Sequence, residues 1–225
     1  MQGASKDFFN QIVSEYDDLI NKHVPFYADI FWTIFHYLPD SFAPKNILEL
    51  GCGTGNLTKL LYEDYKDANY VCVDAASEML KTTKERLPNA KIELIESTFE
   101  KLNLKENSFD LIISSLAIHH LVDEDKQKLF NEISRWLKPG GLFVLADVVR
   151  AVSDKIYEED WNLFEQDNLK NGMSKEDLAK MVEHSKTCDH YSTVPDLLIW
   201  LKKTGFKNSD VLWRCSFWAV FQAEK

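Results

Sequence analysis

The residues with the clearest chemical meaning are three glycines at alternate positions, Gly51, Gly53 and Gly55. They follow an apolar run at 46–50 and precede leucines at helical spacing, a pattern that predicts a strand, a loop and a helix. Glycine lets the backbone turn sharply and approach a ligand, and the helix N-terminus offers free N–H groups. The loop is therefore predicted to bind a nucleotide-like ligand.

The spacing of this loop narrows the ligand. A dinucleotide site prefers G-x-G-x-x-G and a P-loop needs a following Lys-Ser or Lys-Thr pair, and neither pattern is present. Glu49, two positions before the first glycine, would repel a pyrophosphate but suits a ligand that carries an ammonium group. The alternative is a glycine turn that binds nothing.

Asp74 ends the next apolar run, 23 positions after Gly51. A carboxylate at this place in a βαβ unit can accept hydrogen bonds from both hydroxyls of a ribose. Because Asp is also a preferred helix cap, the alternative is a capping residue for the helix that follows. The glycine loop in register with Asp74 favours the ribose role.

Two adjacent histidines, His119 and His120, follow a later apolar run. Imidazole titrates near neutrality, so one of them could serve as a general base, and the alternative is that they hold a loop together. Neighbouring side chains point in different directions, and we expect at most one to face a substrate. No third ligand stands at workable spacing, and Asp147 alone is a poor cation ligand, so no metal site is expected.

The elements that position these residues alternate between strand and helix. Apolar runs predict strands at 46–50, 70–73, 91–95, 110–115 and 142–148, with helices at 55–65, 77–87 and 123–137. Helices are also predicted at 6–22 and 26–38. This order predicts an α/β fold, with a mainly parallel sheet and helices on both faces.

The later part of the chain changes character. Charged helical segments from 150 to about 190 are predicted to cap the carboxyl ends of the strands. A helix at 194–203 and two strands at 206–213 and 215–222 follow, which predicts an antiparallel last strand. We expect one domain, divided into an N-terminal helical lid (1–44), a core (45–149), a helical cap (150–192) and a C-terminal helix with a hairpin (193–225).

The block E-L-G-C-G-T-G at 49–55 resembles motif I of the class I S-adenosylmethionine (SAM)-dependent methyltransferases. The phrase S-F-D-L-I-I-S at 108–114, the loop L-K-P-G-G at 137–141 and the pair Y-D at 16–17 are also similar to motifs of that family. The resemblance implies a Rossmann-like, seven-stranded sheet, SAM as cofactor, and methyl transfer to a small-molecule acceptor.

The motifs and the resemblance together give a set of cofactor-binding residues. These are Tyr16, Glu49, Gly51, Cys52, Gly53, Gly55, Asp74, Ala75, Met79, Thr98, Phe99, Ser114 and Ser115. Thr98 stands where the family commonly has an acid that receives the adenine amino group. A hydroxyl there carries no charge, so we expect a weaker adenine contact.

Two other functions stay open. The segment 24–27 resembles carboxy-SAM synthase, which serves wobble-uridine modification of tRNA and should need cationic residues near the sulfonium. A non-catalytic, SAM-binding regulatory protein is the other. The aromatic stripe at 157, 161 and 164 predicts either core packing or a pocket for an aromatic acceptor.

The composition argues against several other classes of function. The 225 residues include 36 acidic and 26 basic side chains, a net charge of −10 that argues against a broad nucleic-acid surface. Neither a membrane span nor a signal peptide is apparent, and the four cysteines form no C-x-x-C pair. We expect a cytoplasmic protein with reduced thiols, a small-molecule substrate and possible homodimers.

Overall fold

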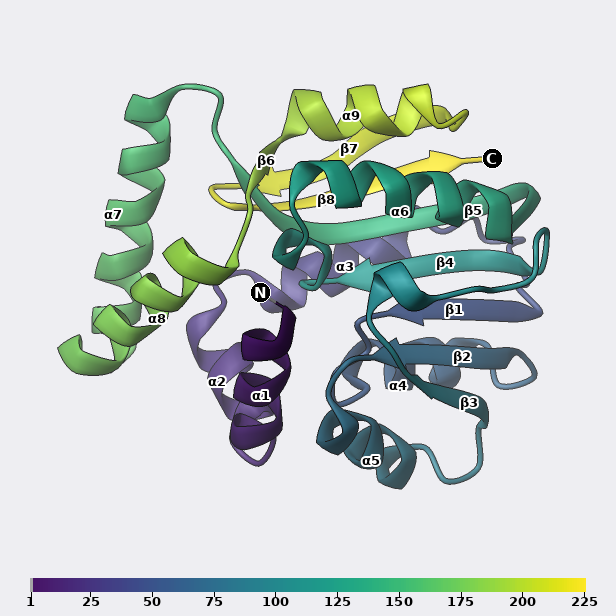
Figure 1. The fold of residues 1–225 in the computed structure, drawn as a ribbon, viewed down its shortest axis with the longest axis horizontal. Coiled ribbons are helices and arrows are strands. Elements are labelled where there is room, and N and C mark those ends of the chain that lie inside the picture. The colour runs from purple at the N-terminus through teal and green to yellow at the C-terminus, as the bar shows by residue number, and fades with distance from the viewer. Residues whose placement is uncertain (1) are drawn as a thin grey trace.

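The computed structural model describes residues 2–225, which form an eight-stranded sheet flanked by helices (Figure 1). Seven strands lie in the order β3-β2-β1-β4-β5-β8-β7, and the short β6 pairs with the end of β5. The strands are β1 (Asn46–Leu50), β2 (Asn69–Asp74), β3 (Lys91–Glu96), β4 (Phe109–Ser115), β5 (Leu137–Arg150), β6 (Ser192–Thr193), β7 (Lys207–Cys215) and β8 (Trp218–Glu224).

The sheet is mainly parallel, as predicted. Strands β3, β2, β1, β4 and β5 run parallel, and β8 pairs antiparallel with both β5 and β7. From β1 the chain adds β2 and β3 on one side of the sheet, and it then returns to add β4 and β5 on the other side of β1. Ligands bind at such switch points in open α/β sheets.

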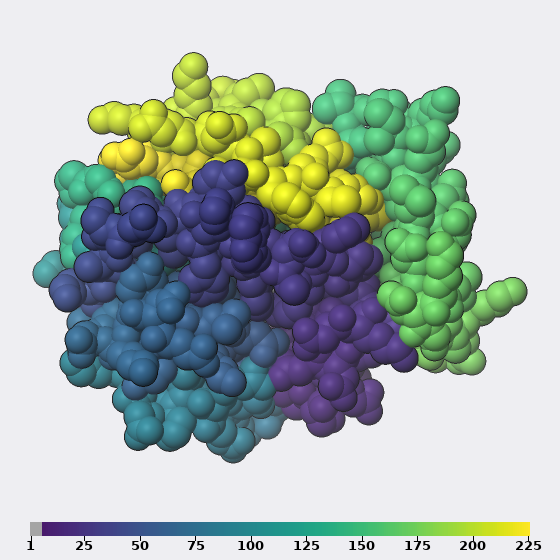
Figure 2. Space-filling model, turned by 180° about the vertical axis from the view of Figure 1, so that it is seen from behind, coloured from purple at the N-terminus to yellow at the C-terminus, as the bar shows by residue number. Residues whose placement is uncertain are grey.

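Helices cover both faces of the sheet because side chains alternate along each strand. In β1, Ile47 packs toward α3 (Tyr27–Tyr37), α4 (Asn56–Asp64) and α5 (Ser77–Arg86), whereas Leu48 packs toward α6 (Asp123–Trp136) and α9 (Val194–Lys203). Figure 2 shows the first of these faces, where α3 lies beside the C-terminal strands β7 and β8.

The N-terminal region differs from the prediction. The single helix expected at 6–22 is two helices, α1 (Gln2–Ile12) and α2 (Tyr16–His23). A tight turn separates them, in which the Glu15 N–H donates to the Ile12 carbonyl at 2.9 Å. Asp17 and Asp18 lie in the first turn of α2, where they stabilise a helix start. We call α1 and α2 the lid.

A second difference concerns the K-P-G-G stretch, which we expected as a loop before a strand at 142–148. Strand β5 already begins at Leu137, which pairs with Phe109 before the register shifts. Gly140 has φ +75°, a conformation that allows the irregularity within the strand. The glycines therefore form a bulge between two paired parts of one strand.

Helices α7 (Asp154–Lys170) and α8 (Lys175–Cys188) form the cap, beside the lid at one end of the sheet (Figure 1). The aromatic stripe of α7 belongs to the core: the rings of Tyr157, Trp161 and Phe164 all pack around Phe217. Within residues 2–225, no helix is both long and apolar enough to cross a bilayer.

Candidate functional site

A cavity lies at the carboxyl ends of β1, β2 and β4, beneath the lid. Its empty volume is ≈ 750 Å³, a figure that includes the solvent-filled space at its mouth. It is lined by Lys6, Phe9, Tyr16, Gly51, Gly53, Asp74, Ala75, Ala76, Met79, Ser97, Thr98, Phe99, Ser115, Leu116, Ala117, His120 and Leu121.

The glycine loop forms the floor of this cavity. Gly51 has φ +74°, and a Cβ added there would lie 2.2 Å from the Cβ of Ala117. The N–H groups of Gly51 and Cys52 both donate to the Val73 carbonyl, at 2.8 and 3.0 Å. The loop is thus packed too closely for a larger residue at position 51 and is held against the end of β2.

Asp74 borders the cavity and also organises the loop. Its Oδ2 accepts from the Gly53 N–H and its Oδ1 from the Ala76 N–H, both at 2.8 Å. Burial raises the pKa of this carboxyl, although the backbone N–H groups oppose that shift. The structural role is therefore present in the protein alone, and the ribose role stays a prediction.

A second, smaller cavity adjoins the first on the α2–α3 side. Tyr16, Gly51 and Gly53 line both, while Glu49, Cys52 and Tyr27 are among the residues that line the second one alone. Glu49 is fully buried, and burial raises the pKa of its carboxyl to about 8. Among the described side chains, the Thr58 hydroxyl is the one that donates a hydrogen bond to this carboxyl. A buried carboxyl of this kind gains a compensating charge when a cation binds beside it.

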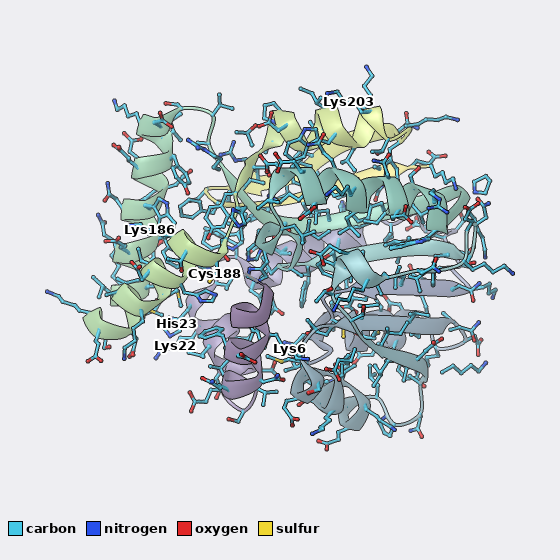
Figure 3. The ribbon with its side chains drawn as sticks, in the orientation of Figure 1. Lys6, Lys22, His23, Lys186, Cys188 and Lys203 are labelled. Carbon is cyan, nitrogen blue, oxygen red and sulfur yellow. The ribbon has the colours of Figure 1, made fainter. Side chains whose placement is uncertain are left out.

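The lid closes over the mouth through several contacts. Lys6 extends from α1 toward the sheet (Figure 3), and its Nζ lies 2.6 Å from Glu96 Oε1 at the end of β3. The ring of Phe8 stacks on His184 of the cap at 4.5 Å between centroids. Phe9 lines the cavity and packs against Tyr16. Neither Lys6 nor Phe9 could be predicted from the sequence, because no motif marks them.

The predicted cofactor residues fall into three groups. Those that line the main cavity are Tyr16, Gly51, Gly53, Asp74, Ala75, Met79, Thr98, Phe99 and Ser115. Glu49 and Cys52 line the second cavity.

Ser114 and Gly55 line neither of these two cavities, and their contact with the cofactor stays a prediction. Ser114 is fully buried and its hydroxyl donates to the Leu50 carbonyl at 2.7 Å. Gly55, at φ +80°, begins α4 and packs against Thr83. Both residues support the loop from behind.

The two histidines lie in a short 3₁₀ turn, Ile118–His120, after β4. His119 Nδ1 lies 2.5 Å from Asp147 Oδ1, and His120 Nδ1 lies 2.9 Å from Asp189 Oδ1. His120 lines the main cavity, whereas His119 is buried behind it. Asp189 follows the cap helix α8, 69 positions after His120, and sequence spacing offers no sign of this contact.

Burial and charge act on the two imidazoles in opposite ways. Burial lowers the pKa of His119, but the Asp147 carboxylate outweighs it and the net shift is upward. Burial and the neighbouring His119 imidazole lower the pKa of His120, although Asp189 opposes that shift. Burial alone would raise the pKa of Asp189, yet the hydrogen bond from His120 and the nearby His119 hold it at about 2.

Comparison with known proteins gives consistent matches. The family described as Methyltransferase domain matches residues 48–145. An uncharacterized methyltransferase of Anoxybacillus flavithermus is 30% identical over 203 residues, covering 89% of this chain and 88% of that protein. The carboxy-S-adenosyl-L-methionine synthase of Trichodesmium erythraeum is 26% identical, with 97% of this chain and 88% of that protein covered.

A solved structure has the same fold. It is a SAM-dependent methyltransferase from Thermotoga maritima, described as a possible histamine N-methyltransferase. The TM-score is 0.66 at 19% identity, over 96% of this chain and 98% of that one.

Proposed function

This chain belongs to the class I SAM-dependent methyltransferases, and we propose that it methylates a small-molecule acceptor bound against His120. The chain is a SAM-dependent enzyme, which sets aside the non-catalytic alternative. The acceptor and the residues that act on it are the proposed part.

The residues at the two cavities fit this cofactor. Gly51 borders both cavities, Asp74 borders the larger one, and the buried Glu49 borders the smaller one. We assign the ribose to Asp74 and the ammonium group to Glu49. When bound, SAM supplies a methyl group on a sulfonium sulfur, which keeps the electron pair of the broken C–S bond.

The observation that carries the proposal is that Asp74 and His120 line one continuous cavity beneath the lid. An acceptor on the His120 side would lie in the same enclosed space as the cofactor. The lid excludes water and aligns the reactants, which supplies much of the rate in such transfers. The proton lost by the acceptor passes to the histidine cluster, where Asp147 and Asp189 stabilise the added positive charge.

A carboxy-SAM synthase is the second candidate, favoured by relatives that match 97% of this chain. That reaction needs a cation to hold the carboxylate of its reactant. Among the described residues that line the cavity, the cationic candidates are Lys6, which pairs with Glu96, and His120, whose pKa is lowered. Methyl transfer is therefore the better supported function.

Mass spectrometry and a methyl-transfer assay test the proposal. We expect the purified enzyme to carry SAM or its demethylated product, and to label a member of a panel of small acceptors from methyl-labelled SAM. His120→Gln should lower kcat at least tenfold, while the control His36→Gln, on the outer face of α3, should not. A bound carboxy-SAM without any methylated product would overturn the proposal in favour of the synthase.

A further inference from the structure

His119, His120 and Asp189 form a cluster at the wall of the main cavity. Each offers one ligand atom, and these atoms lie within 4.8 Å of one another. We infer that this cluster binds a divalent transition-metal ion, with Zn²⁺ as the best match to two imidazoles and one carboxylate.

His119 is oriented as metal-binding histidines usually are. Its Nδ1 faces Asp147 Oδ1 at 2.5 Å, and Asp147 Oδ2 also accepts the main-chain N–H of His119 at 2.9 Å. This fixes the tautomer and turns Nε2 toward Asp189 Oδ1, 3.8 Å away. Nε2 makes no hydrogen bond with residues 6–225, so its lone pair faces the cluster. A carboxylate behind a ligating histidine is the common supporting arrangement in metal sites.

Asp189 and His120 supply the other two ligands. Tyr191 donates its hydroxyl to Asp189 Oδ2 at 3.0 Å, which leaves Oδ1 between the two imidazoles. The Asp189 side chain is 5% exposed and that of His120 18%. A carboxylate this deeply buried needs a compensating positive charge, and a bound ion provides one.

The distances and charges suit an ion. Ligands about 2.1 Å from one tetrahedral Zn²⁺ lie about 3.4 Å apart, so a pair as wide as 4.8 Å must close by about 1.4 Å through side-chain rotation when the ion binds. Lys126 is the neighbouring cation, and its ammonium already donates to the Ser192 hydroxyl and the His190 carbonyl. Asp123 also pairs with Lys126, at 3.4 Å. With neutral imidazoles, the negative charges of Asp147 and Asp189 are then left for the ion to compensate.

Three protein ligands leave a coordination position open, as in catalytic zinc sites. Since His120 lines the cavity, a hydroxyl or thiol acceptor could occupy that position and lose its proton more readily. This role rests on the proposed function, whereas metal binding itself does not.

The test measures metal binding directly and without an acceptor. Chelator-treated protein is titrated with Zn²⁺ by competition calorimetry, and with Co²⁺ by visible absorption, which reports the ligand set. We expect one ion per chain. His119→Gln, His120→Gln and Asp189→Asn should each weaken binding at least 100-fold, and Asp147→Asn, which changes only the supporting carboxylate, by 10–100-fold.

The control His36→Gln removes an imidazole from the outer face of α3 and should bind as wild type does. Circular dichroism shows whether each variant is folded. SAM binding is a second check for Asp189→Asn, because Asp189 does not line the cavity. The inference is overturned if the wild type binds no stoichiometric Zn²⁺ or Co²⁺, or if Asp189→Asn binds as tightly. Either result would leave methyl transfer by the uncoordinated histidines intact, so this failure is distinct from failure of the proposed function.

Discussion

The hydroxyl of Thr54 donates to Asp17 Oδ1 at 2.6 Å, which joins the first turn of the lid helix α2 to the glycine loop. Asn56 donates to the same oxygen at 2.9 Å, and Arg86 pairs with the other one. Burial opposes the ionised form of Asp17, but these hydrogen bonds outweigh it and lower its pKa. The lid is therefore bound to the glycine loop that it covers, and closure of the lid should order the loop.

Asp17→Ala should weaken SAM binding by about 1–2 kcal/mol, because it removes charge-assisted hydrogen bonds that are partly exposed to solvent. Calorimetry gives the affinity, and hydrogen exchange of α2 should rise in the same variant. Asp18→Ala, which removes the neighbouring carboxylate of the same helix, is the matched control. Equal affinity in both variants would show that the lid closes without this contact.

Asp74→Ala should weaken SAM binding by about 1–3 kcal/mol through lost contacts to the ribose hydroxyls. Its carboxylate also holds Gly53 and Ala76, so thermal unfolding must be measured beside the affinity. Comparing SAM with an analogue that lacks the ribose hydroxyls isolates the ribose term. An unchanged affinity for SAM would refute the ribose assignment.

Glu49 should make SAM binding depend on pH. Its pKa is about 8 in the free protein, and a bound ammonium group would lower it. Below pH 8 the carboxyl must then lose a proton on binding, so the affinity should rise with pH between about 6 and 7.5.

Calorimetry at pH 6.5, in buffers of different ionisation enthalpy, counts that proton. The wild type should release one, and Glu49→Gln should release none and bind more weakly at pH 7.5. Proton release that persists in Glu49→Gln would place the titrating group elsewhere.

Thr98→Asp should tighten SAM binding up to about tenfold if the adenine amino group lies beside position 98, because a charged acceptor makes the stronger hydrogen bond. Thr98→Asn has nearly the same shape without the charge and should show little gain. With both variants folded, the absence of tightening would mean that the adenine lies elsewhere in the cavity.

Local patterns were sufficient to predict the sheet. Strand β1 matches the predicted bounds at 46–50, because a buried parallel strand needs a short apolar run between turn residues. The break between α1 and α2 was missed, since no glycine or proline stands at 13–15 and the apolar spacing continues through it. In the structure, Tyr16 lines the cavity and Asp17 accepts from the Thr54 hydroxyl, and both residues lie in the first turn of the second helix.

The site was predictable where sheet topology alone brings residues together. Gly51, Asp74 and Ser115 follow or end parallel strands, whose carboxyl ends meet at one edge of the sheet. Asp189 and Lys6 come from the cap and the lid, which reach the site by tertiary packing that no motif encodes. For the same reason, the third ligand of the histidine cluster was invisible in the sequence.

The contacts of α1 have a consequence for turnover. Lys6 and Glu96 are 38% and 49% exposed, and such a pair contributes at most about 1 kcal/mol. The stack of Phe8 on His184 joins α1 to the cap without involving the sheet. We expect the demethylated cofactor to leave by a swing of α1, with the glycine loop and the strands staying in place. We expect this swing, a step of microseconds to milliseconds in comparable enzymes, to set the upper limit of kcat.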